Sequence, residues 1–321
     1  MKILYLPNEF SQQRQKEKRR WIYPVRLAME AQHYRNTGHT VFWDDPTVSA
    51  DKIIVEPENI NFLNLPYPDR IFTNAFAKKY QGNGNFKYHP GTYIQVANGC
   101  WHGKCVFCVE QGRKQQVREP WHVHQELSEI KRLGFREVFD DSGTFPIGSW
   151  LDEFLRTPHP GLTFGCNMRM VDIDYARMKR YGFRMMLFGI ESANQGTLDR
   201  INKVVRIEDI KWIEKAHQSG IDCHGAVMFG YPWECDGEAL RTLKLVQSLL
   251  RCGILKTAQA SFYKVSGQDS RSDHHRFVRK IYNVCWSPQF WFHKIKDTKT
   301  IDDLKYLWRQ IKEGMRHDYR N

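Results

Sequence analysis

Short apolar segments alternate with amphipathic segments of 7–14 residues from residue 93 to residue 263. A short apolar run is typical of a buried strand, and apolar residues spaced three or four apart are typical of a helix. The predicted strands are residues 93–96, 137–139, 162–166, 185–190, 223–229 and 257–263. The predicted helices between them are residues 122–133, 150–156, 173–181, 207–219 and 238–251. Strands joined through helices run parallel, so the pattern predicts an α/β fold whose six strands form a full barrel, a partial barrel or an open sheet.

The two flanking regions have different patterns. Residues 1–90 predict a small, truncated α/β unit of the Rossmann-like kind, with strands at 2–6, 40–43 and 52–55 and a helix at 24–36. The stretch from 57 to 92 is rich in Pro and Gly and reads as a linker. The chain from about 268 to its end is helical in pattern. We therefore expect three parts: a small unit plus linker at 1–90, a core at 91–265 and a helical extension at 266–321.

Three of the eight cysteines, Cys100, Cys105 and Cys108, cluster with the spacing C-x4-C-x2-C, and the other five are scattered. Thiolates are soft ligands suited to zinc or to iron–sulfur clusters. Three thiolates on one loop can each bind one corner of a cubane and leave a fourth iron open to a small molecule. Alternatives are a zinc site completed by His102 and unligated cysteines. The loop follows the first core strand, at the end where active sites of such folds gather.

Charge and hydropathy narrow the class of protein further. The net charge is +12 and the pI is about 9.3, which favours polyanionic partners such as nucleic acid; the alternative is a solvated basic surface with no partner. Cations and aromatic rings interleave in the tail from 264 to 321, a composition that suits base stacking or a helix core. No apolar run approaches the roughly 18 residues of a membrane helix, and the first residues lack a signal peptide pattern. We expect no membrane partner and a cytoplasmic location.

The cysteine segment resembles the signature of the radical S-adenosylmethionine (SAM) superfamily. Phe107 precedes the last cysteine, as in that signature, although the first gap is one residue longer than usual. Further similar elements follow in order at predicted strand ends: Phe139–Phe145, Phe164–Arg169, Gly189–Ser192, which resembles G-x-E-S, and Gly225–Glu234, which resembles G-x-P-x-E. The resemblance covers about residues 90–265 and implies a partial (β/α)6 barrel of the TIM type.

The resemblance also implies cofactors and site residues. Cys100, Cys105 and Cys108 would hold a [4Fe–4S] cluster that reductively cleaves SAM to a 5′-deoxyadenosyl radical, which abstracts hydrogen from a substrate. The residues expected to position SAM are Phe107, Ser142, Gly143, Asn167, Arg169 and Glu191, with Phe107 near the adenine and Ser142 and Gly143 at the amino group. Cys166 or Tyr231 would donate a hydrogen atom to a product radical. Structural alternatives are a helix N-cap pair for Asp140 and Asp141, an ion pair of Glu191 with a basic residue such as Arg169, and ordinary packing for Cys166 and Tyr231.

Partners and substrate are predicted less directly. The N-terminal unit resembles a cobalamin-binding domain but lacks the D-x-H-x-x-G motif in residues 1–90, so we do not expect cobalamin. The electron donor would be of the flavodoxin or ferredoxin type. The favoured substrate is a nucleic acid base, with aminoacyl-thymidine isomerisation by viral radical SAM enzymes as one case, which would place the protein in the host cytoplasm. Alternatives are methyl transfer or rearrangement on a small metabolite or peptide, and a zinc-stabilised nucleic-acid-binding protein. The sequence does not predict an oligomeric state.

Overall fold

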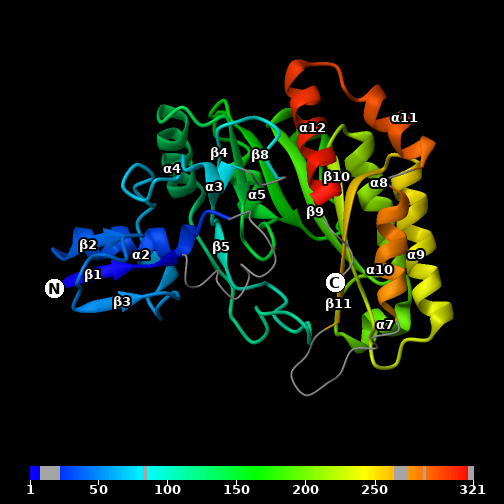
Figure 1. Ribbon diagram of the computed structural model, residues 1–321, viewed down its shortest axis with the longest axis horizontal. Helices are drawn as coiled ribbons and strands as arrows, with labels where there is room; N and C mark the ends of the chain where they lie inside the picture. Colours follow the sequence, from blue (N-terminus) through cyan, green and yellow to red (C-terminus); the bar gives the residue numbers. More distant parts are fainter. Residues whose placement is uncertain (8–21, 82–84, 264–273, 285–286, 317–321) are drawn as a thin grey trace. The chain divides into compact units, whose positions relative to one another are not determined.

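The computed structural model describes residues 1–7, 22–81, 85–263, 274–284 and 287–316 (Figure 1). The chain divides into two compact units. Unit 1 comprises residues 1–98, 116–142 and 146–162. Unit 2 comprises residues 99–115, 143–145 and 163–321. The cysteine loop therefore belongs to the same unit as the later strands of the predicted core. The domain boundaries at 90 and 265 stay predictions.

Unit 1 begins with a three-stranded parallel sheet in the order β2 (Thr40–Trp43), β1 (Lys2–Tyr5), β3 (Lys52–Ile54). Helix α2 (Val25–Asn36) follows β1 and buries Leu27 and Ala31 against Ile3, Tyr5 and Ile54. These elements lie within one residue of the predicted ones, because the strands are apolar and the helix repeats apolar residues at helical spacing.

The stretch predicted as a linker contains two short helices, η1 (Phe62–Asn64) and α3 (Lys78–Gln81), and buries several side chains. Phe62, Arg70, Tyr80 and Phe86 are each at most 1% exposed. The next strand, β4 (Gly91–Ile94), begins two residues before the predicted start. Gly91 explains the difference: a side chain there would collide with the Phe86 ring, so an apolar pattern could not mark this residue as strand.

The remaining elements of unit 1 frame the two ends of the cysteine loop. Strand β4 pairs in parallel with β7 (Glu137–Asp140), and the two-residue strands β5 (Ala97–Asn98) and β6 (Gln116–Val117) pair antiparallel as a hairpin. Helices α4 (Pro120–Arg132) and α5 (Ser149–Phe154) complete the unit. The hairpin brings residues 98 and 116 together, so the 17 residues between them leave and return at one place.

A buried ion-pair network fixes the end of β4 that leads into this loop. Glu126 of α4 lies 2.5 Å from both Arg70 and Arg118, and all three side chains are at most 1% exposed. Arg70 also donates to the Tyr93 carbonyl at 2.8 Å, and Arg118 donates to the Gln95 carbonyl at 3.2 Å. Removing one partner of such a buried network leaves an uncompensated charge. The network therefore holds the strand end and the return of the loop in one arrangement.

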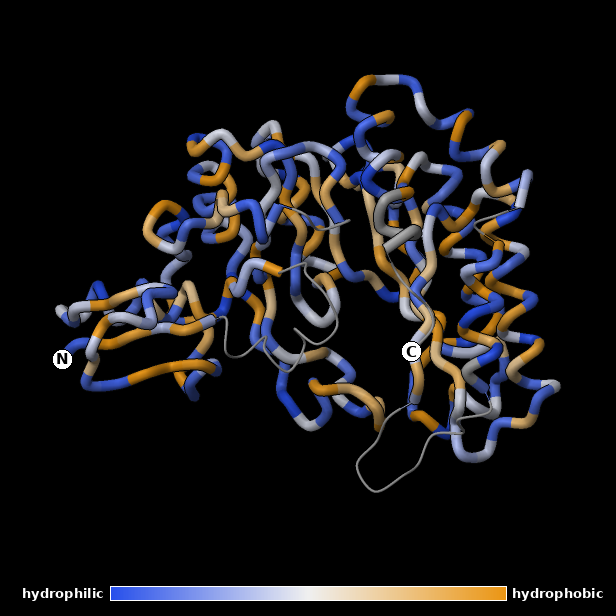
Figure 2. Tube along the Cα trace, in the orientation of Figure 1, coloured by the Kyte–Doolittle hydropathy of each residue, from blue (hydrophilic) through white to orange (hydrophobic). Residues whose placement is uncertain are grey.

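Unit 2 contains four parallel strands, each paired with the next along the chain. They are β8 (Thr163–Met168), β9 (Phe183–Glu191), β10 (Asp222–Phe229) and β11 (Leu255–Phe262). The helices that connect them are α6 (Tyr175–Arg180), α7 (Gln195–Arg200), η2 (Ile207–Asp209), α8 (Ile210–Gln218) and α9 (Asp236–Arg251). Apolar and polar residues alternate along the turns of α9 (Figure 2), which buries residues such as Leu243 and Val246. The described part of the C-terminal extension is helical, as predicted, with α10 (His275–Asn283), α11 (Pro288–Lys296) and α12 (Ile301–Arg316).

The main sheet has six strands in the order β11-β10-β9-β8-β7-β4. Neighbours in the sheet are also neighbours in sequence, whereas the order reverses in a doubly wound sheet. This confirms the predicted α/β fold, and the sequential order, in which β4 and β11 are the outer strands among the described residues, is that of a partial barrel. Within the described residues, no helix is long and apolar enough to cross a membrane.

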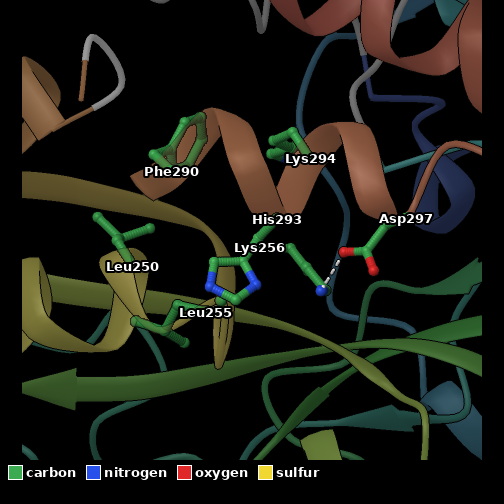
Figure 3. Close-up of a pocket in the computed structure, with 8 residues that line it drawn as sticks. Leu250, Leu255, Lys256, Phe290, His293, Lys294 and Asp297 are labelled. Carbon is green, nitrogen blue, oxygen red and sulfur yellow. Dashed lines mark hydrogen bonds and ion pairs between the residues drawn. The ribbon is translucent and has the colours of Figure 1, made fainter. Parts of the chain in front are cut away.

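Helix α11 packs at the amino end of β11, away from the strand ends that carry the candidate site residues. Leu250, Leu255, Phe290 and His293 line a small pocket there, beside the Lys256–Asp297 ion pair (Figure 3). The aromatic side chains of the C-terminal extension differ in burial. Phe277 and Phe290 are buried, as expected for a helix core, whereas Phe292 and Trp308 are 64% and 55% exposed.

Candidate functional site

The cysteine loop, residues 99–115, is closed by backbone contacts. Gly99 has φ +79°, and a Cβ there would lie 2.6 Å from the Lys114 carbonyl oxygen, so the loop approaches itself more closely than a side chain allows. The Gly112 N–H donates to the Gly103 carbonyl at 2.8 Å, and the Cys108 N–H donates to the Cys105 carbonyl at 3.1 Å. The three cysteines therefore lie on one compact loop that is held together by backbone hydrogen bonds.

The three thiols are half-buried and interact electrostatically with one another. Burial raises the pKa of the Cys105 thiol to about 11, against the opposing effect of the Lys203 ammonium. Burial also raises the pKa of Cys108. Thiolates in this loop therefore need a positively charged partner, which a metal centre supplies. The soft donor set and the shared loop fit an iron–sulfur cluster.

A segment that sequence analysis did not identify, residues 201–203 after α7, docks on the loop. The Ile201 carbonyl accepts from the Val106 N–H at 3.1 Å, and the Asn202 carbonyl lies 2.6 Å from His102 Nε2. The Cys105 thiol donates to the same Asn202 carbonyl at 3.7 Å. His102, the fourth ligand in the alternative zinc site, is thus hydrogen-bonded through Nε2 to the Asn202 backbone carbonyl.

A site for a single metal ion requires side-chain ligands that converge on one point. Within the part of the chain that the structure describes, no three His, Cys, Asp or Glu side chains converge as the ligands of one metal ion would. The ligands of a cubane stand apart instead, because each thiolate binds its own iron.

Lys203 forms an ion pair with Glu191 beside the thiols. The Nζ to Oε1 distance is 2.5 Å, and the two side chains are 17% and 10% exposed. Glu191 is the last residue of β9 and has φ +61°, a left-handed conformation that directs the chain out of the strand. A Cβ at Gly189 would collide with both the Glu191 carboxylate and the Lys203 ammonium. The glycine of the G-x-E-S element therefore makes room for this ion pair.

Arg169 follows β8 and stacks on the cysteine loop instead of pairing with Glu191. Its guanidinium carbon lies 3.9 Å from the ring centroid of Trp101. Burial lowers the pKa of Arg169, and Cys100 opposes this electrostatically. Asn167, partly exposed, holds the Phe145 N–H through its carbonyl at 2.8 Å. The structure thus brings Arg169, Glu191 and the cysteine loop together and adds Lys203; that Asn167, Arg169 and Glu191 position SAM stays a prediction.

Ser142 has a different environment, in unit 1. Its hydroxyl is fully buried, accepts from the Val96 and Ala97 N–H groups at 3.1 and 2.8 Å, and donates to Asp140 at 2.8 Å. These bonds hold the end of β7 to the segment that precedes the cysteine loop. Asp140 is the last residue of β7, so it does not cap a helix.

The other predicted residues lie in packed surroundings. Cys166 is fully buried and interacts with Tyr175 of α6. Phe107 packs against an apolar cluster formed by Leu198, Ile201, Met228, Tyr231 and Tyr263. Tyr231 is fully buried, and burial raises its pKa well above the usual value. The hydrogen-donor roles of Cys166 and Tyr231 and the adenine contact of Phe107 stay predictions.

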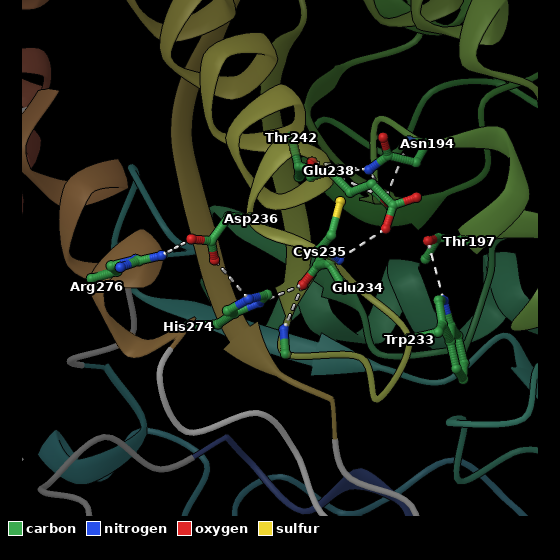
Figure 4. Close-up of polar contacts among 12 residues, drawn as sticks. Asn194, Thr197, Trp233, Glu234, Cys235, Asp236, Glu238, Thr242, His274 and Arg276 are labelled. Atoms are coloured by element: carbon green, nitrogen blue, oxygen red, sulfur yellow. Dashed lines mark hydrogen bonds and ion pairs between the residues drawn. The ribbon is translucent and has the colours of Figure 1, made fainter.

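The turn after β10 is held by a buried carboxylate (Figure 4). Glu234 Oε2 accepts from the Gly230 N–H at 2.8 Å and lies 2.9 Å from His274 Nδ1, and both side chains are fully buried. Burial raises the pKa of Glu234. Sequence analysis identified the G-x-P-x-E element but not His274, because 40 residues separate the two partners and no local pattern links them.

Comparison with known proteins places this geometry in a family context. Residues 94–246 match the model of the radical SAM superfamily. An uncharacterized methyltransferase of Pyrococcus horikoshii is 26% identical over 204 residues, covering 60% of this chain and 42% of the relative. An uncharacterized protein of Methanocaldococcus jannaschii is 24% identical over 181 residues, covering 49% of this chain and 56% of the relative. The chain thus spans less than two thirds of the length of either relative.

Solved structures give matches of lower sequence identity. The radical SAM methyltransferase TsrM of Kitasatospora setae, with tryptophan and a SAM analogue bound, has a TM-score of 0.49 and 18% identity, covering 61% of this chain and 38% of that one. OxsB, a cobalamin-dependent SAM radical enzyme, has a TM-score of 0.49 and 13% identity, covering 75% of this chain and 37% of that one.

Proposed function

We propose that this chain is a radical SAM enzyme, because residues 94–246 match the model of that superfamily, and that Cys100, Cys105 and Cys108 hold its [4Fe–4S] cluster. The supporting observation is that three half-buried thiols share one closed loop and interact with one another. When bound, the cluster and SAM together supply the chemistry, a one-electron cleavage that yields methionine and a 5′-deoxyadenosyl radical. A flavodoxin- or ferredoxin-type protein would provide the electron. That cobalamin is not used stays a prediction.

The residues around the loop have distinct proposed roles. Lys203 and Arg169 are the cations that interact with the thiols, and they suit the carboxylate of SAM. Glu191 holds Lys203 in place through the ion pair that Gly189 admits. The Ser142 side chain is occupied by structural hydrogen bonds, so its proposed contribution is to set the backbone that continues into Gly143.

Substitution of one ligand tests the cluster assignment. Cys105→Ala is expected to remove both the brown chromophore near ~400 nm of a [4Fe–4S] centre and the production of 5′-deoxyadenosine from SAM and dithionite under anaerobic conditions. Cys252→Ala is the matched control, because Cys252 is exposed and outside the loop. Retention of either signal at wild-type level by Cys105→Ala contradicts the assignment.

Metal analysis tests the non-enzymatic alternative. Anaerobically purified protein is expected to contain about four iron and four sulfide per chain, as a [4Fe–4S] centre requires. One zinc and no sulfide would instead support a zinc-stabilised nucleic-acid-binding protein.

For the substrate, we propose a nucleic acid base, with aminoacyl-thymidine isomerisation as one case. The net charge of +12 supports a polyanionic substrate. The likeness to an uncharacterized methyltransferase supports a second candidate, radical methyl transfer. Mass spectrometry after anaerobic turnover separates them: methyl transfer from SAM leaves S-adenosylhomocysteine and a product heavier by one methylene, whereas isomerisation leaves the substrate mass unchanged.

A further inference from the structure

Glu110, in the cysteine loop, has one carboxylate oxygen that is left without a partner. Its Oε1 lies 3.6 Å from Arg113, whose side chain is 62% exposed, so this pair is weak. Its Oε2 is buried and, among the residues that the structure describes, makes no hydrogen bond. An unsatisfied buried acceptor is costly, and a charged one more so. The arrangement therefore suits a ligand that brings a donor to Oε2.

The position of Glu110 indicates which donor this is. The Glu110 N–H donates to Cys108 Sγ at 3.4 Å, which ties the residue to a proposed cluster ligand. On its other side, the Glu110 Cγ lies 3.4 Å from the place that a Cβ at Gly143 would occupy. Next to Gly143, the Thr144 hydroxyl is also buried and, within the described chain, has no hydrogen-bond partner. Two unsatisfied polar groups, the Glu110 carboxylate and the Thr144 hydroxyl, thus lie on either side of Gly143, one in the cysteine loop and one in the next residue.

We propose that the Glu110 carboxylate accepts a hydrogen bond from the α-amino group of SAM. This inference rests on the proposed function, which places the amino-acid end of SAM at the cluster. A carboxylate accepts but cannot donate, so Oε2 fits an amine and repels a second carboxylate. The Thr144 hydroxyl can both donate and accept, and it fits the neighbouring polar atoms of the same amino-acid group. Glu110 then selects cofactors that carry a free amino group.

Binding measurements on Glu110→Gln test this proposal. The probes are SAM and 5′-methylthioadenosine, which keeps the adenosine but lacks the amino acid, and the protein is the anaerobically reconstituted full chain. The dissociation constant for SAM is expected to rise about tenfold, because a charge-assisted hydrogen bond is lost. The constant for 5′-methylthioadenosine is expected to stay at the wild-type value. Glu119→Gln, an exposed glutamate nearby in sequence, is the matched control and should leave both constants unchanged.

Iron content separates the outcomes. A Glu110→Gln protein with four irons that binds SAM with the wild-type constant overturns the proposal, and so does equal weakening of SAM and 5′-methylthioadenosine. Thr144→Val, which removes the neighbouring hydroxyl, is expected to weaken SAM but not 5′-methylthioadenosine. Failure of the wild-type protein to bind SAM at all would instead count against the proposed function.

Discussion

At the scale of single residues, Gly189 determines whether the Lys203–Glu191 ion pair can form. A Cβ at this position would overlap the ends of both charged side chains, which are flexible, and no backbone atom. Gly189→Ala is therefore expected to displace the ion pair and leave the fold intact. We expect 5′-deoxyadenosine formation to fall about tenfold or more, with a Tm change within about 3 °C. Kinetics and thermal unfolding measured on the same sample check this, and full activity would show that the pair is dispensable.

Motifs at predicted strand ends singled out Glu191 and Arg169, and the structure places both beside the cysteine loop. That these two residues position SAM stays a prediction. Lys203 was missed because it follows a helix and reaches Glu191 only through the fold. Ser142 was expected to contact the amino group of SAM, which stays a prediction; its hydroxyl accepts from two backbone N–H groups more than 40 residues away in sequence. Such long-range bonds leave no periodic signal.

At the scale of elements, closure of the cysteine loop depends on Gly99. Alanine there would carry the cost of φ +79°, about 1 kcal/mol, and would also press on the Lys114 carbonyl. Gly112→Ala is a matched control in the same loop, since Gly112 has φ +74° but no atom within 4 Å of its Cβ position. Gly99→Ala is expected to bind well under four irons per chain, and Gly112→Ala to keep about four. Equal iron content in the two variants would contradict the importance of this contact.

A second prediction at this scale concerns the end of β7. Burial raises the pKa of Asp140 from 3.8 to about 7, although the Val96 N–H and the Ser142 hydroxyl oppose the shift. The folded-state pKa is above the unfolded one, so this stabilisation is present below about pH 4 and is lost as the pH rises to about 7. The free energy of unfolding of wild type relative to Asp140→Asn is expected to fall by up to about 4 kcal/mol between pH 4 and pH 8. Urea unfolding at both pH values measures it, and a constant difference would refute a raised pKa.

Elements were predictable in proportion to their length and periodicity. Strand β2 was predicted to the residue, and α9 is long and amphipathic enough to be recognised from spacing alone. The hairpin of β5 and β6 has two residues per strand and was not predicted, because so short a pair has no pattern of its own. Arg118, the residue after β6, belongs to the buried network with Arg70 and Glu126, which joins residues from three separate segments and so leaves no local pattern either.

At the scale of the whole molecule, the sequence predicted parallel strands but did not determine their order in the sheet. Alternation of strands and helices requires parallel strands, yet the same alternation is compatible with a barrel, a partial barrel and a doubly wound sheet. The sequential order from β4 to β11 resolves this. Net charge is another property of the whole chain. A positive net charge favours polyanionic partners, which the fold alone does not indicate.

The expected preference for polyanionic partners can be tested by measuring nucleic acid binding. A chain with a net charge of +12 is expected to bind single-stranded DNA at about 50 mM salt and to lose about tenfold or more in affinity by 200 mM, because bound phosphates release counterions.

Trp308 is 55% exposed on α12 beside the exposed Lys305, an arrangement that suits base stacking. Trp308→Ala is therefore expected to weaken binding about tenfold, whereas Leu304→Ala, which removes an exposed aliphatic side chain from the same helix, should not. Fluorescence anisotropy with labelled oligonucleotides measures both effects. Absence of binding at 50 mM salt would remove the physical reason for a nucleic acid substrate, and equal effects of the two substitutions would point to an apolar contact instead of stacking.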